Sequence, residues 1–150
     1  MTQRLPVSVL FPCSFNGVRS PMAAGLMKPM FGSRLFVESC GAQTKDADLD
    51  PFMLPVMDEI GIDLSGHNPK TFGNLEDDCF DVIVSLTPSA QLGAAALTRN
   101  SATILLFWLT SNPSLTEGRR DKILAAYRET RDALAAHMKA EFGAPSTFDA

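Results

Sequence analysis

The sequence predicts an α/β protein: a single domain with a four-stranded parallel sheet flanked by helices. Apolar runs of strand length alternate with helical segments along the chain, and strands separated by helices form parallel sheets with right-handed crossovers. Two runs, 80–86 and 103–107, are continuously apolar, which is typical of strands buried on both faces. At 150 residues, the chain has the length of one ordinary domain.

The elements follow one another without a repeat or a linker. Strands are predicted at 7–11, 35–39, 80–86 and 103–107, and helices at about 21–30, 52–61, 89–97 and 117–142. The last helix has the clearest pattern, since Ile123, Tyr127, Leu134 and Met138 fall near one helical stripe. One domain is therefore expected over residues 1–150, with a loose tail at 143–150.

Composition excludes several functional classes. The formal net charge of −4 argues against nucleic acid as a partner. No apolar run is long enough to span a membrane, and no signal peptide opens the sequence. The three cysteines lack the paired spacing of a disulfide framework, which indicates a reducing compartment. We therefore expect a cytoplasmic protein that binds neither nucleic acid nor membranes.

The segment from Cys13 to Ser20 connects the first predicted strand to the first predicted helix. A loop that enters a helix N-terminus presents unpaired backbone N–H groups and the positive end of the helix dipole, and both bind anions. Cys13 at one end and Arg19 at the other place a thiolate nucleophile opposite a guanidinium fork that matches two oxygens of a phosphate-like group. The pattern therefore predicts a nucleophile facing a tetrahedral oxyanion.

Other residue types in this loop suit the same purpose. Ser20 is predicted to cap the helix and can also donate its hydroxyl proton to the Cys13 sulfur. Asn16 and Gly17 tolerate the positive φ values of a loop wrapped around an anion. The predicted oxyanion-binding set is Ser14, Phe15, Asn16, Gly17, Val18, Arg19 and Ser20. The two histidines are isolated from each other and from the cysteines, so we expect no metal and no other cofactor.

The run VLFPCSFNGVRSPMA resembles the phosphate-binding loop of the low-molecular-weight protein tyrosine phosphatases and of the arsenate reductases that share their fold. Further segments resemble the same family, and together they extend the resemblance over residues 6–142: 37–42 (VESCGA), 59–67 (EIGIDLSGH), 80–84 (FDVIV) and 108–134. The resemblance implies supporting roles for Ser39, His67 and Trp108. His67 would help to hold the binding loop, and Trp108 would either line the substrate entrance or close the core.

The resemblance implies a protein tyrosine phosphatase-like hydrolase of phosphomonoesters. Cys13 would attack phosphorus to give a phosphocysteine that water hydrolyses, with an aspartic acid from the last loop as general acid and base. In this chain Asn112 stands at that catalytic position, followed by Pro113. An amide cannot donate and recover a proton as a carboxylic acid does. We therefore expect oxyanion binding with slow turnover.

Two alternatives remain open. The first is an arsenate reductase that uses an external low-molecular-weight thiol, because residues 86–94 lack the two further cysteines of an internal relay. The second is a non-catalytic module that binds an oxyanion or a phosphoprotein. The expected ligands are therefore phosphate, arsenate or a phosphotyrosine-type group, with a low-molecular-weight thiol or a phosphoprotein as a partner.

The other two cysteines have simpler interpretations. Cys40 is expected to be a small buried residue, and a reversible disulfide with Cys13 remains open because both follow neighbouring strands. Cys79 opens an apolar strand and is expected in the core.

Overall fold

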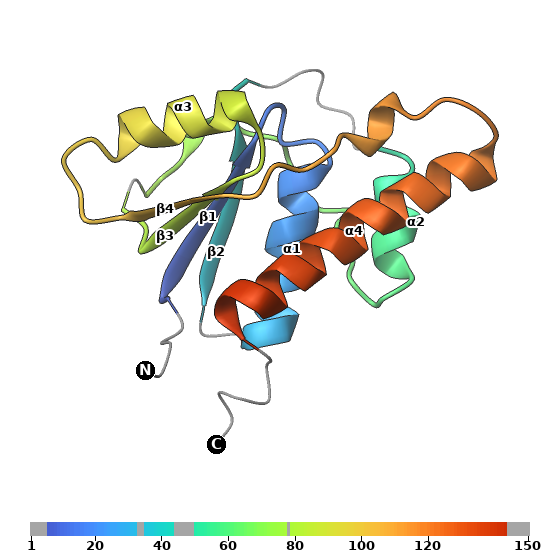
Figure 1. The fold of residues 1–150 in the computed structure, drawn as a ribbon, viewed down its shortest axis with the longest axis horizontal. Helices are drawn as coiled ribbons and strands as arrows, with labels where there is room; N and C mark the ends of the chain where they lie inside the picture. The colour runs from blue at the N-terminus through green and yellow to red at the C-terminus, as the bar shows by residue number, and fades with distance from the viewer. Residues whose placement is uncertain (1–5, 33–34, 44–49, 78, 144–150) are drawn as a thin grey trace.

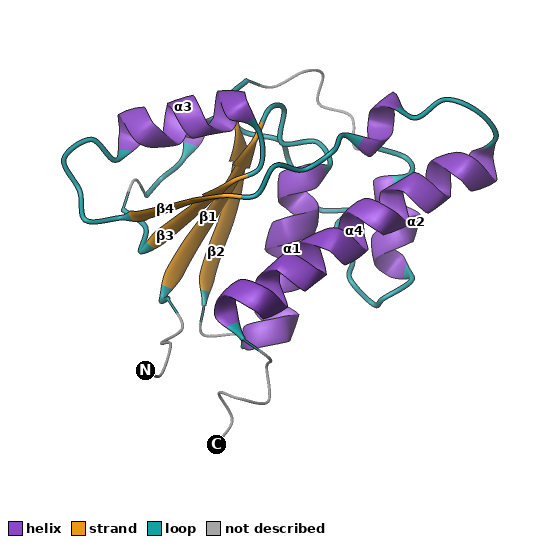
Figure 2. Cartoon of the chain, in the orientation of Figure 1, coloured by secondary structure: helices purple, strands orange, loops and turns teal. Residues whose placement is uncertain are grey.

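A computed structural model describes residues 6–32, 35–43, 50–77 and 79–143. Within these residues the strands are β1 (Ser8–Cys13), β2 (Phe36–Gly41), β3 (Val82–Ser85) and β4 (Ile104–Phe107). The helices are α1 (Arg19–Phe31), α2 (Met53–Asp58), α3 (Pro88–Leu97) and α4 (Arg120–Phe142), with 3₁₀ turns at η1 (Phe72–Asn74) and η2 (Pro113–Leu115). Figure 1 shows their arrangement and Figure 2 colours them by type.

The four strands form one parallel sheet in the order β2-β1-β3-β4, which confirms the predicted fold class. β1 lies between β2 and β3, with Cys13 opposite Gly41 and Val9 opposite Val82. The chain moves to one side of β1 to make β2 and to the other side to make β3. Ligands of such sheets bind beyond the carboxyl ends of the strands at this switch point. Cys13 ends β1 there.

Helices cover both faces of the sheet: α1 and α4 lie on one face and α3 on the other (Figure 1). Successive strand residues point to opposite faces, so β1 contributes to two cores. Val9, Phe11 and Cys13 join the larger core beneath α1 and α4. Leu10 joins the smaller core, whose other buried members are Cys40, Phe80, Ile83 and Ala94.

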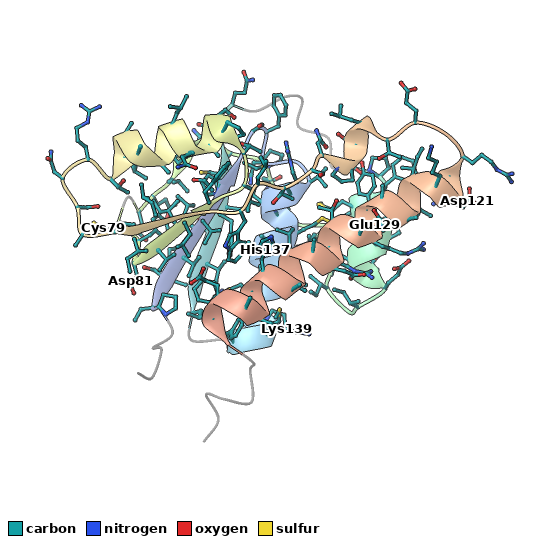
Figure 3. All side chains as sticks on the ribbon, viewed as in Figure 1. Cys79, Asp81, Asp121, Glu129, His137 and Lys139 are labelled. Carbon is teal, nitrogen blue, oxygen red and sulfur yellow. The ribbon has the colours of Figure 1, made fainter. Side chains whose placement is uncertain are left out.

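Several local predictions are corrected. β1 extends through Cys13, and α1 begins at Arg19 with no side-chain cap, so Ser20 is not the N-cap. The prediction that residues 103–107 are buried on both faces is wrong, because β4 is an edge strand and Ile104 is 59% exposed. Cys79 is exposed, not buried; Figure 3 shows it beside Asp81, ahead of β3. Residues 144–150 of the predicted loose tail lie outside the described residues.

Candidate active site

The loop from Cys13 to Arg19 is fixed at its base by the two strands beside β1. The Ala42 N–H donates to the Cys13 carbonyl at 2.9 Å, and the Gln43 N–H donates to the Ser14 carbonyl at 3.0 Å. On the other side, the Leu86 N–H donates to the Pro12 carbonyl at 3.0 Å. The nucleophile therefore enters the loop from a backbone that is bonded on both sides.

The Cys13 sulfur lies inside this loop and is only 1% exposed as a residue. Its Sγ is 3.0 Å from Ser20 Oγ and 3.2 Å from the backbone nitrogen of Asn16. The Asn16 N–H donates to sulfur, and the Ser20 hydroxyl is able to do so. A sulfur nucleophile at this position has both groups within hydrogen-bonding distance. The Ser20–sulfur contact predicted from the sequence is present.

Asn16 links the loop to the rest of the site. It is fully buried and has the positive φ expected of this position, 57°. Its Nδ2 donates to Ser20 Oγ at 2.8 Å and to Ser39 Oγ at 3.0 Å, and its Oδ1 accepts the Lys70 N–H at 2.9 Å. The Asn16 carbonyl accepts from His67 Nε2 at 2.9 Å. Every polar group of this side chain is used to hold the loop.

His67 and Lys70 approach the loop together from the segment before η1. Because a carbonyl oxygen only accepts, His67 Nε2 carries the proton in its bond to Asn16. Burial lowers the pKa of His67; the bond to Asn16 opposes this shift, and the nearby Lys70 charge adds to it. Lys70 Nζ is paired with Glu38 Oε2 at 2.7 Å. His67 therefore supports the loop and does not touch the Cys13 sulfur.

Arg19 is the first residue of α1, and its guanidinium donates to the Thr110 carbonyl at 3.1 Å. Burial lowers the pKa of Arg19, and the Cys13 charge opposes this shift. The five-donor guanidinium makes no other hydrogen bond to the described residues, so its remaining N–H groups are available to an oxyanion. The loop after β4 therefore orients the cation that would bind the ligand.

The remaining members of the predicted oxyanion-binding set lie on the partly exposed side of the loop: Ser14, Phe15, Gly17 and Val18. Ser14 Oγ is 3.1 Å from Ser89 Oγ, next to the N-terminus of α3, where Thr87 Oγ1 accepts the Ala90 N–H at 3.2 Å. Gly17 does not have the predicted positive φ, which within the described non-glycine residues belongs to Asn16. A second helix N-terminus thus adjoins the loop, a feature that the sequence reasoning missed.

Asn112 does not contact the Cys13 sulfur. Its side chain caps η2, with Oδ1 accepting the Ser114 N–H at 3.0 Å and the Ser114 hydroxyl at 2.6 Å. Within the described residues, no carboxylate hydrogen-bonds to Cys13 or to Arg19. The site therefore combines a buried thiol with a guanidinium, and no carboxylate among the described residues is hydrogen-bonded to either.

Trp108 and Cys40 lie in the two cores. Trp108 is 6% exposed and packs between Phe11 and Phe142, with the His137 ring stacked on it at 5.1 Å, so it closes the core. Cys40 is fully buried, as expected, in the core on the α3 face, whereas Cys13 belongs to the core on the α1 face. Burial, with the Cys13 charge, raises the pKa of Cys40 to about 12. The two thiols therefore face opposite sides of the sheet.

The described residues contain no group of three or more histidine, cysteine or carboxylate side chains placed to hold a metal ion. Among them, no helix has both the length and the apolar character needed to cross a membrane.

Two curated relatives of this chain are named as arsenate reductases. The Synechocystis "Glutaredoxin arsenate reductase" is 36% identical over 78 residues, which make up 52% of this chain and 58% of that enzyme, so the match spans less than two thirds of the relative. An "Arsenate reductase" of Halalkalibacterium halodurans is 28% identical over 131 residues, 87% of this chain and 91% of the enzyme.

The solved structures that resemble this chain include both an arsenate reductase and a phosphatase. An arsenate reductase in a phosphate-binding state has a TM-score of 0.68 at 25% identity and covers 89% of this chain and 94% of its own. A low molecular weight protein tyrosine phosphatase from T. tengcongensis has a TM-score of 0.70 at 22% identity, covering 87% and 93%. The model of the family described as low molecular weight phosphotyrosine protein phosphatase matches residues 8–138. With a cysteine and an arginine at the two ends of its loop, this chain belongs to that family of cysteine-dependent phosphatases and arsenate reductases.

Proposed function

We propose that Cys13 attacks a tetrahedral oxyanion, and that the reaction is phosphomonoester hydrolysis with slow turnover. The observation that carries the proposal is the Cys13 sulfur held by the Asn16 N–H and Ser20 Oγ, with Arg19 at the other end of the loop. The thiolate displaces the ester oxygen, which leaves as an alkoxide or phenolate and takes its proton from water. Water then cleaves the S–P bond and returns phosphate and the thiolate.

Asn112 is the reason to expect slow turnover. This position carries an amide, and within the described part of the chain no carboxylate hydrogen-bonds to Cys13 or Arg19. Water therefore has to protonate the leaving group. Acid–base assistance usually contributes about 10²–10⁴-fold. Esters with good leaving groups such as nitrophenolate depend least on protonation by a general acid, so we expect activity on these substrates.

Arsenate reduction with an external thiol is the second candidate, and the curated relatives named arsenate reductases favour it. Cys13 would displace hydroxide from arsenate to form an S–As(V) bond. A thiol RSH would then attack the Cys13 sulfur, forming a mixed disulfide as the S–As electron pair reduces As(V) to As(III). A second RSH would release Cys13 and RSSR. Because Cys40 faces away from Cys13, a small thiol from outside the chain suits this sequence of steps better.

One experiment separates the candidates. Hydrolysis of p-nitrophenyl phosphate and glutathione-dependent reduction of arsenate are measured with the parent chain and with Cys13→Ser, and phosphate binding is measured by calorimetry. Hydrolysis without arsenate reduction supports the first candidate, and the reverse supports the second. Binding without either reaction would overturn both and leave the non-catalytic module. The cytoplasmic location expected from the sequence suits any of these activities, since each needs a reduced Cys13.

A further inference from the structure

The outer edge of β4 is apolar and uncovered. Ile104 is 59% exposed, Leu105 40% and Phe107 42%, and Leu109, just beyond the strand, is 70% exposed. β4 is the last strand of the sheet, on the side away from β2. Exposed apolar patches of this kind mark interaction sites.

Among the described residues, none hydrogen-bonds to the outer side of the β4 backbone. The Ile104 N–H donates to the Asp81 carbonyl at 3.0 Å, and the Trp108 N–H donates to the Ser85 carbonyl at 2.9 Å, both toward the β3 side. Bonding direction alternates along a strand, so the N–H and C=O groups of Leu105 and Phe107 point outward. The edge thus offers a row of donors and acceptors to another strand.

Protein sheets normally protect such an edge with lysine, proline or a bulge. The segment 103–111 (TILLFWLTS) contains no charged residue and no proline. The β4 edge therefore lacks the residues that usually prevent an edge strand from pairing with another strand. Because the segment is uncharged, two copies of it meet without like-charge repulsion.

We propose that β4 pairs with β4 of a second copy of this chain, antiparallel, across a two-fold axis through Leu106. This register pairs the outward-bonding groups of both Leu105 and Phe107, whereas an axis through either of these residues would shift one of the two beyond β4. Each Leu105 lies in a hydrogen-bonded pair opposite Phe107 of the other copy, the two Leu106 residues face each other without direct bonds, and each Ile104 lies opposite Trp108. The two sheets join into one continuous sheet of eight strands.

The pairing has two consequences. Four-residue strands bury little surface, so the dimer belongs to the small, transient class of interfaces, with dissociation constants around the micromolar range. The antiparallel arrangement places the carboxyl ends of the two sheets at opposite ends of the dimer. Each Cys13 loop therefore remains open, and activity per chain does not depend on dimerisation.

Sedimentation equilibrium of the full chain over about 1 μM to 1 mM tests the pairing. The weight-average mass is expected to rise with concentration, between 16.2 kDa and twice this value. Leu105→Lys is expected to raise the dissociation constant at least about tenfold, because the pairing would bury two uncompensated charges. Leu115→Lys changes a comparably apolar residue, 76% exposed in η2, and is expected to dimerise like the parent.

Amide hydrogen exchange tests the register itself. The amides of Leu105 and Phe107 are expected to slow at least about tenfold between the dilute and concentrated samples. Those of Ile104 and Trp108, already bonded toward β3, are expected to change less. A mass of 16.2 kDa at every concentration would overturn the proposal and leave the edge to another partner. So would a dimer that Leu105→Lys does not weaken, or one in which the Leu105 and Phe107 amides exchange as in the monomer.

Discussion

Gly41 lies directly against the backbone of Asn16. A Cβ atom on residue 41 would be 2.8 Å from the Asn16 nitrogen, and it would also be 2.8 Å from the Phe15 carbonyl carbon and 2.7 Å from the Gln43 carbonyl oxygen. Each of these neighbours is backbone and cannot rotate away. The end of β2 therefore fixes how closely the oxyanion loop approaches the sheet, and the nitrogen concerned is the one that donates to Cys13 Sγ.

Gly41→Ala is expected to displace the loop. Overpacking of this kind costs about 1–3 kcal/mol of unfolding free energy, and phosphate affinity should fall with it because the loop N–H groups move. Urea denaturation and calorimetric phosphate titration measure the two effects. Gly66→Ala is the matched control, since a Cβ there has no neighbour within 4 Å. Equal phosphate affinity in the two variants would show that the Gly41 contact does not shape the loop.

Asn112→Asp is expected to raise kcat about tenfold on aryl phosphates with poor leaving groups. This increase is smaller than the rate enhancement of about 10²–10⁴-fold that a general acid usually provides. The limit arises because Ser114 donates two hydrogen bonds to the side-chain oxygen at this position, and these bonds favour an ionised carboxylate.

Adding Ser114→Ala removes the hydroxyl bond, so the double variant should be faster than Asn112→Asp alone. Leaving-group dependence of kcat is the measurement. If Asn112→Asp is no faster than the parent on any leaving group, position 112 does not reach the leaving oxygen.

His67 is expected to make the protein less stable in mild acid. Its folded-state pKa is lowered by burial, so it lies below the unfolded value of about 6.5. Above this pKa the imidazole ring is neutral in both the folded and the unfolded state, so its titration does not change the unfolding free energy. As pH falls below about 6.5, the unfolded chain binds a proton that the folded chain resists, and the unfolding free energy decreases.

Urea midpoints measured between about pH 7.5 and pH 5.5, one pH unit either side of the unfolded pKa, follow this effect. His67→Gln lacks the titrating group and should show a smaller decrease over the same range. His137→Gln is the comparison, because His137 is an exposed residue of α4 although its ring stacks on Trp108. The account fails if His67→Gln and the parent lose stability equally.

Mild oxidation is expected not to join Cys13 to Cys40. Cys40 pairs with Pro12 in the β1–β2 ladder and faces the α3 side of the sheet, whereas Cys13 faces the α1 side. Bridging them would require a strand to turn over. Peptide mapping by mass spectrometry after treatment with peroxide should find Cys13 as a sulfenic acid or its further oxidised forms. A Cys13–Cys40 crosslink in the folded protein would contradict this placement.

The loop could be predicted closely from the sequence because its parts are neighbours along the chain. The positive φ of Asn16 and the Ser20–sulfur contact follow from residue types within eight positions. The prediction that Ser20 caps α1 was wrong because the Ser20 hydroxyl also has a partner from another strand, which neighbouring residues do not reveal. Its hydroxyl is directed at Cys13 and at the Cys40 carbonyl, 3.3 Å away, and the Cys40 contact comes from another strand.

The sequence by itself determined the alternation of strands and helices, the cysteine and arginine at the two ends of one loop, and an amide at position 112, where the family resemblance implies a carboxylic acid. The tertiary structure decided what depends on strand order and distant contacts. It set the bond from Arg19 to Thr110, 91 residues along the chain, and it placed β4 at an edge although its composition indicated a buried strand. Local backbone preferences act over a few residues, whereas the packing of the sheet assigns each apolar run its neighbours.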